Sequence, residues 1–301
     1  MKIAIIGAGI SGCNLYFNLK EKYNDITIFD KARGTGGRLS TKYIGDKFID
    51  HGTPFLEPHT DELKDFCLYL SSQNILKARY DKFTPKNGMN KACSFLIKKD
   101  DFIRQTRITK ATFNEKWTLE DDNNNKYEDF DMLLITIPAT QLLQMNIELD
   151  DDIKENLVKV NYDSRFTLIL HSNNDKKLDK NLFLENENIE KIIDNSKKYL
   201  YKDFSSYVIH CNNDFSNKHN EKSKEEIFEI FKETLSNKAL EEISSFEQIP
   251  HLWKYAFAKT CLDMPFYYNE KNKLGICGDY FHLNNVEGAY LSSSILSDKF
   301  I

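Results

Sequence analysis

The chain of 301 residues is longer than one typical domain and can form a two-lobed protein. Hydrophobic residues make up 41% of it and charged residues 29%, so a sizeable core and a well-solvated surface can both form. The net charge of −5 at pH 7 gives no reason to expect a nucleic-acid partner. No run of 18 or more apolar residues occurs, and the first residues lack a signal-peptide pattern, so we expect no membrane contact and a cytoplasmic location.

The six cysteines are widely spaced and include no CxxC pair. They stand at positions 13, 67, 93, 211, 261 and 277. This spacing argues against a zinc site and against a disulfide framework. We therefore expect no bound metal, and reduced thiols that are mostly buried.

The first thirty residues have the pattern of a β-α-β unit. Residues 2–7 predict a strand, residues 11–22 a helix, and residues 26–29 a second strand that ends at Asp30. A GxGxxG motif (Gly7, Gly9 and Gly12) lies where the first strand meets the helix. Its glycines allow close approach of a pyrophosphate, which the helix N-terminus attracts, and Asp30 can accept hydrogen bonds from ribose hydroxyls. The unit therefore predicts a site for the ADP half of FAD.

A second glycine-rich turn follows Asp30 directly. It runs from Lys31 to Arg38 and includes Gly36 and Gly37. Such a turn is unusual for a plain NAD site, and it suits a chain that wraps further phosphate and flavin surface, with Arg38 offsetting pyrophosphate charge. The alternative interpretation is a flexible basic loop.

The rest of the chain predicts two kinds of structure. Residues 62–76 have helical spacing, 101–119 suggest two strands around a turn, 121–126 a loop, and 132–138 a buried strand closed by Pro138. Residues 150–250 predict an antiparallel sheet with a helix at 222–235, and 273–277 predict a last strand before a closing helix. The expected fold is α/β with an α+β second lobe: a Rossmann-type FAD-binding domain (1–66, 88–155 and 266–301) and a smaller antiparallel-sheet substrate domain (67–87 and 156–265).

His251, Trp253 and Tyr255 alternate along a predicted strand, so they share one face. An imidazole, an indole and a phenol on one face can line a site for a planar ring. A core aromatic cluster with an inert histidine is the competing interpretation. His51 and Phe55 are further candidates for a substrate pocket, whereas His171, His210, His219 and His282 are expected to be surface or structural residues.

Several blocks of the sequence resemble one family. The string RGTGGRLST at 33–41 resembles a signature of renalase-like flavoproteins, a branch of the amine oxidase and p-hydroxybenzoate hydroxylase group. The resemblance recurs at both ends of the chain, in DHGTPF (50–55), GMN (88–90), HLWKYA (251–256), CGD (277–279) and VEGA (286–289). Departures from the family pattern at Leu252, Thr53 and Tyr280 fall mainly on the substrate side.

The resemblance implies noncovalent FAD and an antiparallel sheet over its isoalloxazine ring. It places the Asp279 carboxylate at the ribityl chain or pyrophosphate, a helix starting at Val286 near the O2 side of the ring, and the Ile108 backbone at the adenine. Combined with the glycine motifs, it gives the expected cofactor-binding residues Gly7, Gly9, Ile10, Ser11, Gly12, Asp30, Lys31, Gly36, Gly37, Arg38, Ile108, Gly278, Asp279, Val286, Glu287 and Gly288.

The functional hypothesis is an FAD-dependent oxidase with His251, Trp253 and Tyr255 at the catalytic face. By resemblance, the substrate is an isomeric 2- or 6-dihydro-NAD(P), which gives a hydride to flavin N5, and O2 is then reduced to H2O2. One alternative is a flavin amine oxidase or a desaturase that acts on another small substrate. Another is a non-catalytic flavin- or NAD-binding redox module.

Overall fold

The structure is a computed structural model that describes all 301 residues, and it divides into two compact units. Unit 1 comprises residues 1–40, 55–161 and 258–301, and unit 2 comprises residues 41–54 and 162–257. These units differ from the predicted domains, because residues 67–87 lie in unit 1 and residues 41–54 in unit 2. The cause is packing: Leu70 and Phe83 belong to the core of unit 1, whereas Ile49 packs in unit 2.

Unit 1 is built on a six-stranded sheet with the order β17-β18-β11-β1-β2-β7. Five strands run parallel, and β17 is an antiparallel edge strand. Their bounds are β1 (Lys2–Ile6), β2 (Asp25–Asp30), β7 (Phe102–Arg104), β11 (Met132–Ile135), β17 (Tyr267–Asn269) and β18 (Leu274–Ile276). All four residues of β11 are buried, which explains its continuous apolar sequence. The strand order changes direction at β1 and β11, the position where open α/β sheets bind ligands.

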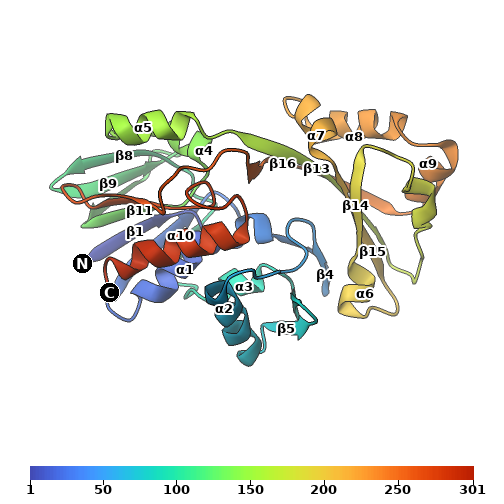
Figure 1. Cartoon of the computed structure of the whole chain (residues 1–301), viewed down its shortest axis with the longest axis horizontal. Helices are drawn as coiled ribbons and strands as arrows, with labels where there is room; N and C mark the ends of the chain where they lie inside the picture. The colour runs from blue at the N-terminus through green and yellow to red at the C-terminus, as the bar shows by residue number, and fades with distance from the viewer. The chain divides into compact units, whose positions relative to one another are not determined.

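Helices and smaller sheets surround this sheet. Helices α1 (Ile10–Leu19) and α10 (Val286–Asp298) lie side by side (Figure 1). The other helices of unit 1 are α2 (Asp61–Ser72), α3 (Lys91–Ser94), α4 (Ala139–Leu143) and α5 (Asp151–Val158), with a 3-10 turn at Gly37–Leu39. The remaining strands are β5 (Leu76–Arg79), β6 (Lys82–Pro85), β8 (Ile108–Asn114), β9 (Lys116–Asp121), β10 (Lys126–Phe130) and β12 (Asn146–Ile147).

Unit 2 is an antiparallel sheet with helices on one face. The sheet has the order β14-β15-β13-β16, with β13 (Tyr162–Ser172), β14 (Ile189–Asp194), β15 (Ser205–Cys211) and β16 (Glu247–Ala258). Helices α7 (Asn213–Lys218), α8 (Lys224–Glu233) and α9 (Asn237–Ser244) cover the face that carries Phe166, Leu168 and Ile209 (Figure 1). We call the other face the helix-free face. The unit also contains a 3-10 turn (Lys180–Phe183), α6 (Asn195–Tyr199) and the hairpin of β3 (Thr41–Ile44) and β4 (Lys47–Asp50).

The predicted elements agree with the structure except at specific points. The antiparallel sheet within 150–250, the helix near 222–235 and the closing helix are confirmed. The first predicted strand of 101–119 is wrong, because Gln105 has φ 55° and the chain changes sheets there, from β7 to β8. The helix expected at 62–76 ends at Ser72, and the segment 151–158 forms α5 in unit 1.

Two general features complete the description. No helix combines the length and the apolar character needed to cross a membrane. All six cysteines are free thiols, and all but Cys261 are buried.

Candidate functional site

The turn between β1 and α1 has the geometry of a dinucleotide-binding turn. A Cβ added to Gly12 would lie 1.9 Å from the Gly7 carbonyl oxygen, so only glycine lets the helix approach the strand this closely. By contrast, a Cβ added to Gly9 would meet nothing within 4 Å. Gly9 also caps α1 without a side-chain hydrogen bond, so the cap leaves the first N–H groups of α1, at Ile10 and Ser11, without a side-chain acceptor.

The two glycine-rich turns of the sequence lie against one another. The Gly36 N–H donates to the Ala8 carbonyl oxygen at 2.8 Å, and a Cβ on Gly37 would contact the Cα of Gly9 at 3.4 Å. Gly36 has φ 115°, a conformation that favours glycine. The second turn therefore borders the open space beside α1, and it is more than a flexible basic loop.

Asp30 stands at the end of β2, as the sequence predicted, and it organises both turns. Its two carboxylate oxygens each accept a backbone hydrogen bond at 2.7 Å, one from Ala8 and one from Ala32. Burial raises the pKa of the Asp30 carboxyl, and the two backbone hydrogen bonds oppose this shift. The Asp30 carbonyl oxygen accepts from Thr106, two residues before Ile108 at the start of β8. Burial also lowers the pKa of the neighbouring Lys31.

Arg38 and Asp279 are both predicted cofactor residues, and the structure pairs them with each other. The guanidinium of Arg38 makes two hydrogen bonds to the carboxylate, at 2.6 and 2.7 Å. The Asp279 side chain is 2% exposed and that of Arg38 is 32% exposed. Gly278 and Asp279 follow β18, so this bidentate pair lies beyond the carboxyl ends of the parallel strands.

The start of α10 carries the last group of predicted cofactor residues. Asn285 caps the helix by accepting from the Gly288 N–H at 2.9 Å. Glu287 is buried, and one of its oxygens accepts from the backbone N–H groups of His59 and Thr60 and from the Thr60 hydroxyl. Glu287 therefore holds the segment that begins α2, a role that the sequence did not indicate.

Unit 2 brings together three of the predicted substrate-side residues. The ring of His51 stacks on Trp253 with centroids 5.3 Å apart, and the ring of His251 lies 4.9 Å from His51 and 4.3 Å from Trp253. The Trp253 indole N–H donates to the His51 carbonyl oxygen at 3.3 Å. Burial lowers the pKa of His51 to about 4 and that of His251 to about 3, so both imidazoles are neutral near pH 7.

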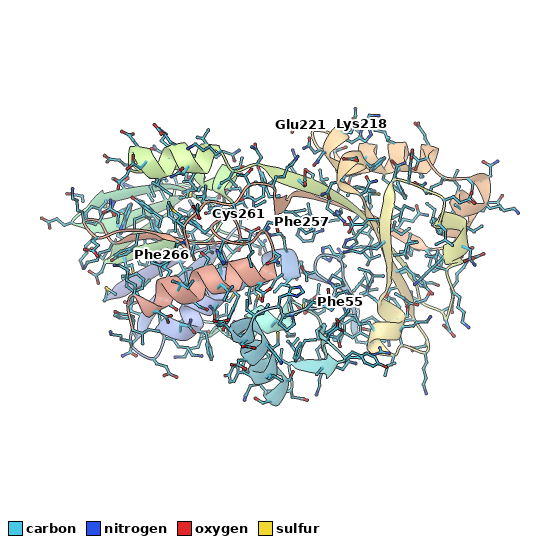
Figure 2. All side chains as sticks on the ribbon, viewed as in Figure 1. Phe55, Lys218, Glu221, Phe257, Cys261 and Phe266 are labelled. Atoms are coloured by element: carbon cyan, nitrogen blue, oxygen red, sulfur yellow. The ribbon has the colours of Figure 1, made fainter.

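Two predicted residues make ring contacts outside this cluster. The ring of Tyr255 contacts Tyr162, with centroids 5.4 Å apart. Phe55, which is labelled in Figure 2, belongs to unit 1. The Lys82 ammonium lies 4.2 Å from its ring centroid. His51 and Phe55 therefore belong to different units, although they are close in sequence.

Sequence reasoning missed the residues that hold His51 in place. The buried carboxylate of Asp50 pairs with Lys198 and accepts from the hydroxyls of Thr41 and Tyr199 at 2.6 and 2.5 Å. Lys198 also donates to the Pro54 carbonyl oxygen at 2.6 Å. The block DHGTPF could have suggested an anchoring role for Asp50, but nothing in the sequence points to Lys198.

All the predicted cofactor residues lie in unit 1, and their arrangement fits a dinucleotide. The open space beside Gly9 and the uncapped N-terminus of α1 suit a pyrophosphate, because backbone N–H groups and the helix dipole both favour an anion. Asp30 lies at the end of the adjacent strand, where a ribose is bound in this type of fold.

The comparisons with known proteins agree with this geometry. Residues 5–70 match the family model described as "NAD(P)-binding Rossmann-like domain". The Rossmann-type domain is confirmed. The chain is also similar to renalase from Mus musculus, with 22% identity over 199 residues, or 56% of this chain and 57% of that protein. It therefore aligns with little more than half the length of this curated relative, and the resemblance to renalase found in the sequence is confirmed at low identity.

Solved structures show that the whole chain has a known fold. A putative protoporphyrinogen oxidase from Exiguobacterium has a TM-score of 0.66 at 10% identity, with 99% of this chain and 98% of that chain covered. A putrescine oxidase bound to putrescine has a TM-score of 0.67 at 11% identity, with 99% and 98% covered. A fatty acid isomerase from P. acnes has a TM-score of 0.67 at 12% identity, with 100% and 99% covered. The predicted fold class is thereby confirmed: a Rossmann-type domain joined to an antiparallel-sheet unit.

Proposed function

We propose that the chain is an FAD-dependent oxidase of the renalase type. The observation that carries this proposal is the joined pair of glycine turns in unit 1, with Gly9 open to a ligand and Asp30 at the end of β2. The similarity to renalase and the fold shared with two proteins named as oxidases support the same class of activity. Bound FAD would supply a two-electron acceptor, which no side chain of the chain can provide.

In this proposal the residues of unit 1 hold the cofactor. The first N–H groups of α1, at Ile10 and Ser11, bind the pyrophosphate, and Asp30 accepts hydrogen bonds from the ribose. The Arg38–Asp279 pair places a guanidinium beside the same turns, where it offsets phosphate charge while its partner carboxylate keeps it in one orientation. These roles need no covalent attachment, so the FAD is noncovalent.

The residues of unit 2 take the substrate in this proposal. His51, His251 and Trp253 form a neutral aromatic surface that suits a planar heterocycle, and neutral imidazoles can donate or accept a hydrogen bond without adding charge. A dihydropyridine, such as 2- or 6-dihydro-NAD(P), has the flat ring that this surface favours. Oxidation of such a ring needs orientation more than acid–base catalysis, which agrees with histidines that stay neutral. We further propose O2 as the electron acceptor and the cytoplasm as the location.

A pair of glycine variants tests the cofactor assignment. Gly12→Ala would place a methyl group 1.9 Å from a backbone oxygen and force α1 away from β1, so we expect loss of bound FAD. Gly45→Asn, in the β3–β4 hairpin of unit 2, is the control, because a Cβ there meets nothing within 4 Å and asparagine tolerates the φ of 58° at this position. FAD is measured by releasing it from the purified protein and identifying it by chromatography. Equal FAD content in both variants, or the absence of flavin from the unaltered protein, would contradict the proposal.

Anaerobic mixing tests the substrate. The FAD-loaded protein is mixed with 2- and 6-dihydro-NAD(P), with ordinary NADH and with a panel of amines that includes putrescine, and the visible flavin absorbance is followed before oxygen is readmitted. We expect rapid bleaching by the dihydro isomers alone and H2O2 on reoxidation. Bleaching by an amine alone would identify an amine oxidase. A flavin that no compound bleaches would favour a non-catalytic redox module.

A further inference from the structure

The helix-free face of the unit 2 sheet carries a group of buried polar side chains that the chain itself does not satisfy. Arg165, Thr167 and His210 are 4%, 0% and 5% exposed, respectively. Arg165 Nε, Thr167 Oγ1 and His210 Nε2 are buried and have no hydrogen-bond partner. Buried polar groups in folded proteins nearly always have a partner, which is protein, water or a ligand. We call these three residues the polar row.

The three side chains are neighbours on one face. Thr167 and His210 stand directly opposite one another in the pairing of β13 with β15. Arg165 precedes Thr167 by two residues, so its side chain points to the same side of the sheet, while Phe166 between them packs into the core beneath the helices. Opposed Cβ atoms are about 4.5–5.5 Å apart, and next-but-one residues of a strand are about 7 Å apart, so the three side chains are close enough to contact one small polar group.

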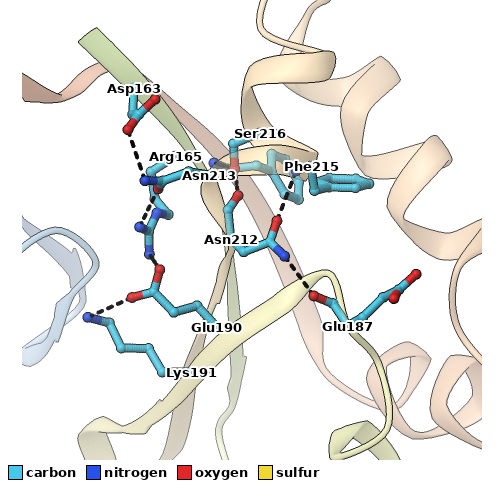
Figure 3. A network of polar contacts seen from close by, with 10 residues as sticks. Asp163, Arg165, Glu187, Glu190, Lys191, Asn212, Asn213, Phe215 and Ser216 are labelled. Atoms are coloured by element: carbon cyan, nitrogen blue, oxygen red, sulfur yellow. Dashed lines mark hydrogen bonds and ion pairs between the residues drawn. The ribbon is translucent and has the colours of Figure 1, made fainter. Parts of the chain in front are cut away.

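Arg165 is fixed by partners that leave part of its guanidinium unused (Figure 3). Its Nη2 donates to Asn213 at 2.6 Å, its Nη1 pairs with Glu190 at 2.5 Å, and its charge lies 5.1 Å from the ring of Phe257. Arg165 has five N–H donors, and these partners engage only two of its nitrogens, so Nε remains without an acceptor. A guanidinium held this rigidly keeps its free donor in one direction.

The charges around the row allow an anion to enter. Lys191 lies opposite His210 in the sheet, and Glu190 is near both Arg165 and Lys191. The carboxylate of Asp163 is also close, but it accepts from the side-chain amides of Asn213 and Asn217 at 3.0 and 2.7 Å. The side chains of Glu190 and Lys191 are 39% and 42% exposed. Because both side chains reach water, solvent weakens the repulsion between Glu190 and an anion held at the free Nε of Arg165.

The free groups of the polar row are all able to donate. A guanidinium N–H is only a donor, a threonine hydroxyl rotates to donate, and a neutral imidazole carries its proton on either nitrogen. Three convergent donors are best satisfied by a group that has several acceptor oxygens. We propose that the polar row binds an anionic group of the substrate, either a carboxylate or a phosphate. This inference rests on the proposed function and adds the charge of the substrate to it.

Three probes that each carry one aromatic ring test this inference by binding alone, without enzymatic turnover. Benzoate, phenyl phosphate and benzamide are titrated into the FAD-loaded protein, and binding is followed by isothermal calorimetry. We expect benzoate or phenyl phosphate to bind at least about tenfold more tightly than neutral benzamide, as expected for one charge-assisted hydrogen bond. The anion that binds more tightly shows whether the polar row recognises a carboxylate or a phosphate. Equal affinity for all three probes, or no saturable binding of either anion, would overturn the inference.

Variants identify the residues that select the anion. Arg165→Met is expected to abolish the preference for the anion. Thr167→Val keeps the shape of the side chain but removes the hydroxyl, and it is expected to weaken anion binding about tenfold. Glu190→Gln is expected to tighten anion binding, because it removes the competing carboxylate. Ser205→Ala is the matched control: its hydroxyl is also buried and unpartnered, but it lies on β15 with the residues that face the helices.

The outcomes separate three cases. If Thr167→Val leaves anion binding unchanged and Arg165→Met still prefers the anion, the row holds ordered water only and the inference is wrong. If Arg165→Met does not fold, the Thr167→Val and Glu190→Gln titrations decide alone. If the anion preference is present but no dihydropyridine bleaches the flavin, the inference on charge stands and the proposed substrate is wrong.

Discussion

The neutral histidines of unit 2 make its stability depend on pH. His51, His210 and His251 have pKa values lowered to about 4, 3 and 3, against an ordinary value of about 6.5, and burial is the largest cause for each. Below pH 6.5 the unfolded chain therefore binds more protons than the folded chain, and folding is destabilised as the pH falls towards 4. Each such histidine contributes a slope of about 1.4 kcal/mol per pH unit.

We expect the free energy of unfolding, measured by urea titration, to fall between pH 6.5 and pH 4.5. The variant His210→Gln should show a shallower dependence on pH, because one titrating group is lost. His282→Gln serves as the control, since His282 is exposed. Identical slopes for the two variants would show that burial of His210 does not set its protonation.

A single substitution also tests how much the Arg38–Asp279 pair contributes to stability. Because Asp279 is 2% exposed, Arg38→Met would leave a buried carboxylate without its cation. Loss of one partner of a buried ion pair costs about 3–5 kcal/mol, so we expect a clearly lower melting temperature and lower FAD affinity. Arg38→Lys keeps the charge but loses the bidentate geometry. Its melting temperature and FAD affinity should lie between those of Arg38→Met and those of the unaltered protein. A melting temperature for Arg38→Met equal to that of the unaltered protein would refute this reasoning.

Among the elements, α2 depends on α10 through one carboxylate. Glu287 at the start of α10 accepts three hydrogen bonds from His59 and Thr60, and Thr60 in turn caps α2. Glu287→Gln keeps the size of the side chain but removes the charge that strengthens these bonds. Faster amide hydrogen exchange is expected in residues 59–66, with little change in α8. The exposed Glu62→Gln in α2 is the control, and equal exchange in both variants would show that Glu287 does not hold the segment.

For the whole molecule, the two-unit architecture predicts where the cofactor acts. A ligand that binds only the folded state stabilises it by about 2.7 kcal/mol at a hundredfold excess over Kd. Every predicted FAD-binding residue lies in unit 1, so added FAD should slow amide exchange most strongly there, in residues 7–14, 30–40 and 278–290. Hydrogen exchange of the FAD-free and FAD-loaded protein measures this directly. Protection centred on β13 to β16 would move the cofactor assignment to unit 2.

The sequence by itself determined the β-α-β unit and the glycine motif at its turn. A glycine that must approach a backbone oxygen, as Gly12 approaches Gly7, is a local requirement, so it is visible within twelve residues. The period-two alternation of β16 likewise placed His251 and Trp253 on one face, because side-chain direction in a strand follows from the backbone. Strong local signals of this kind also predicted the helix near 222–235, which begins with a capping box at Ser223.

Only the tertiary structure decided which distant residues meet. Lys198 reaches Asp50 across about 150 residues of chain, and Glu287 reaches Thr60 across more than 220, and no periodic pattern encodes such pairs. The structure also moved residues 67–87 into unit 1 and showed that His210, expected to be a surface or structural residue, is buried beside Thr167 with an unpartnered nitrogen. Burial and partners depend on which strands pair, and that pairing follows from packing of the whole chain more than from local propensity.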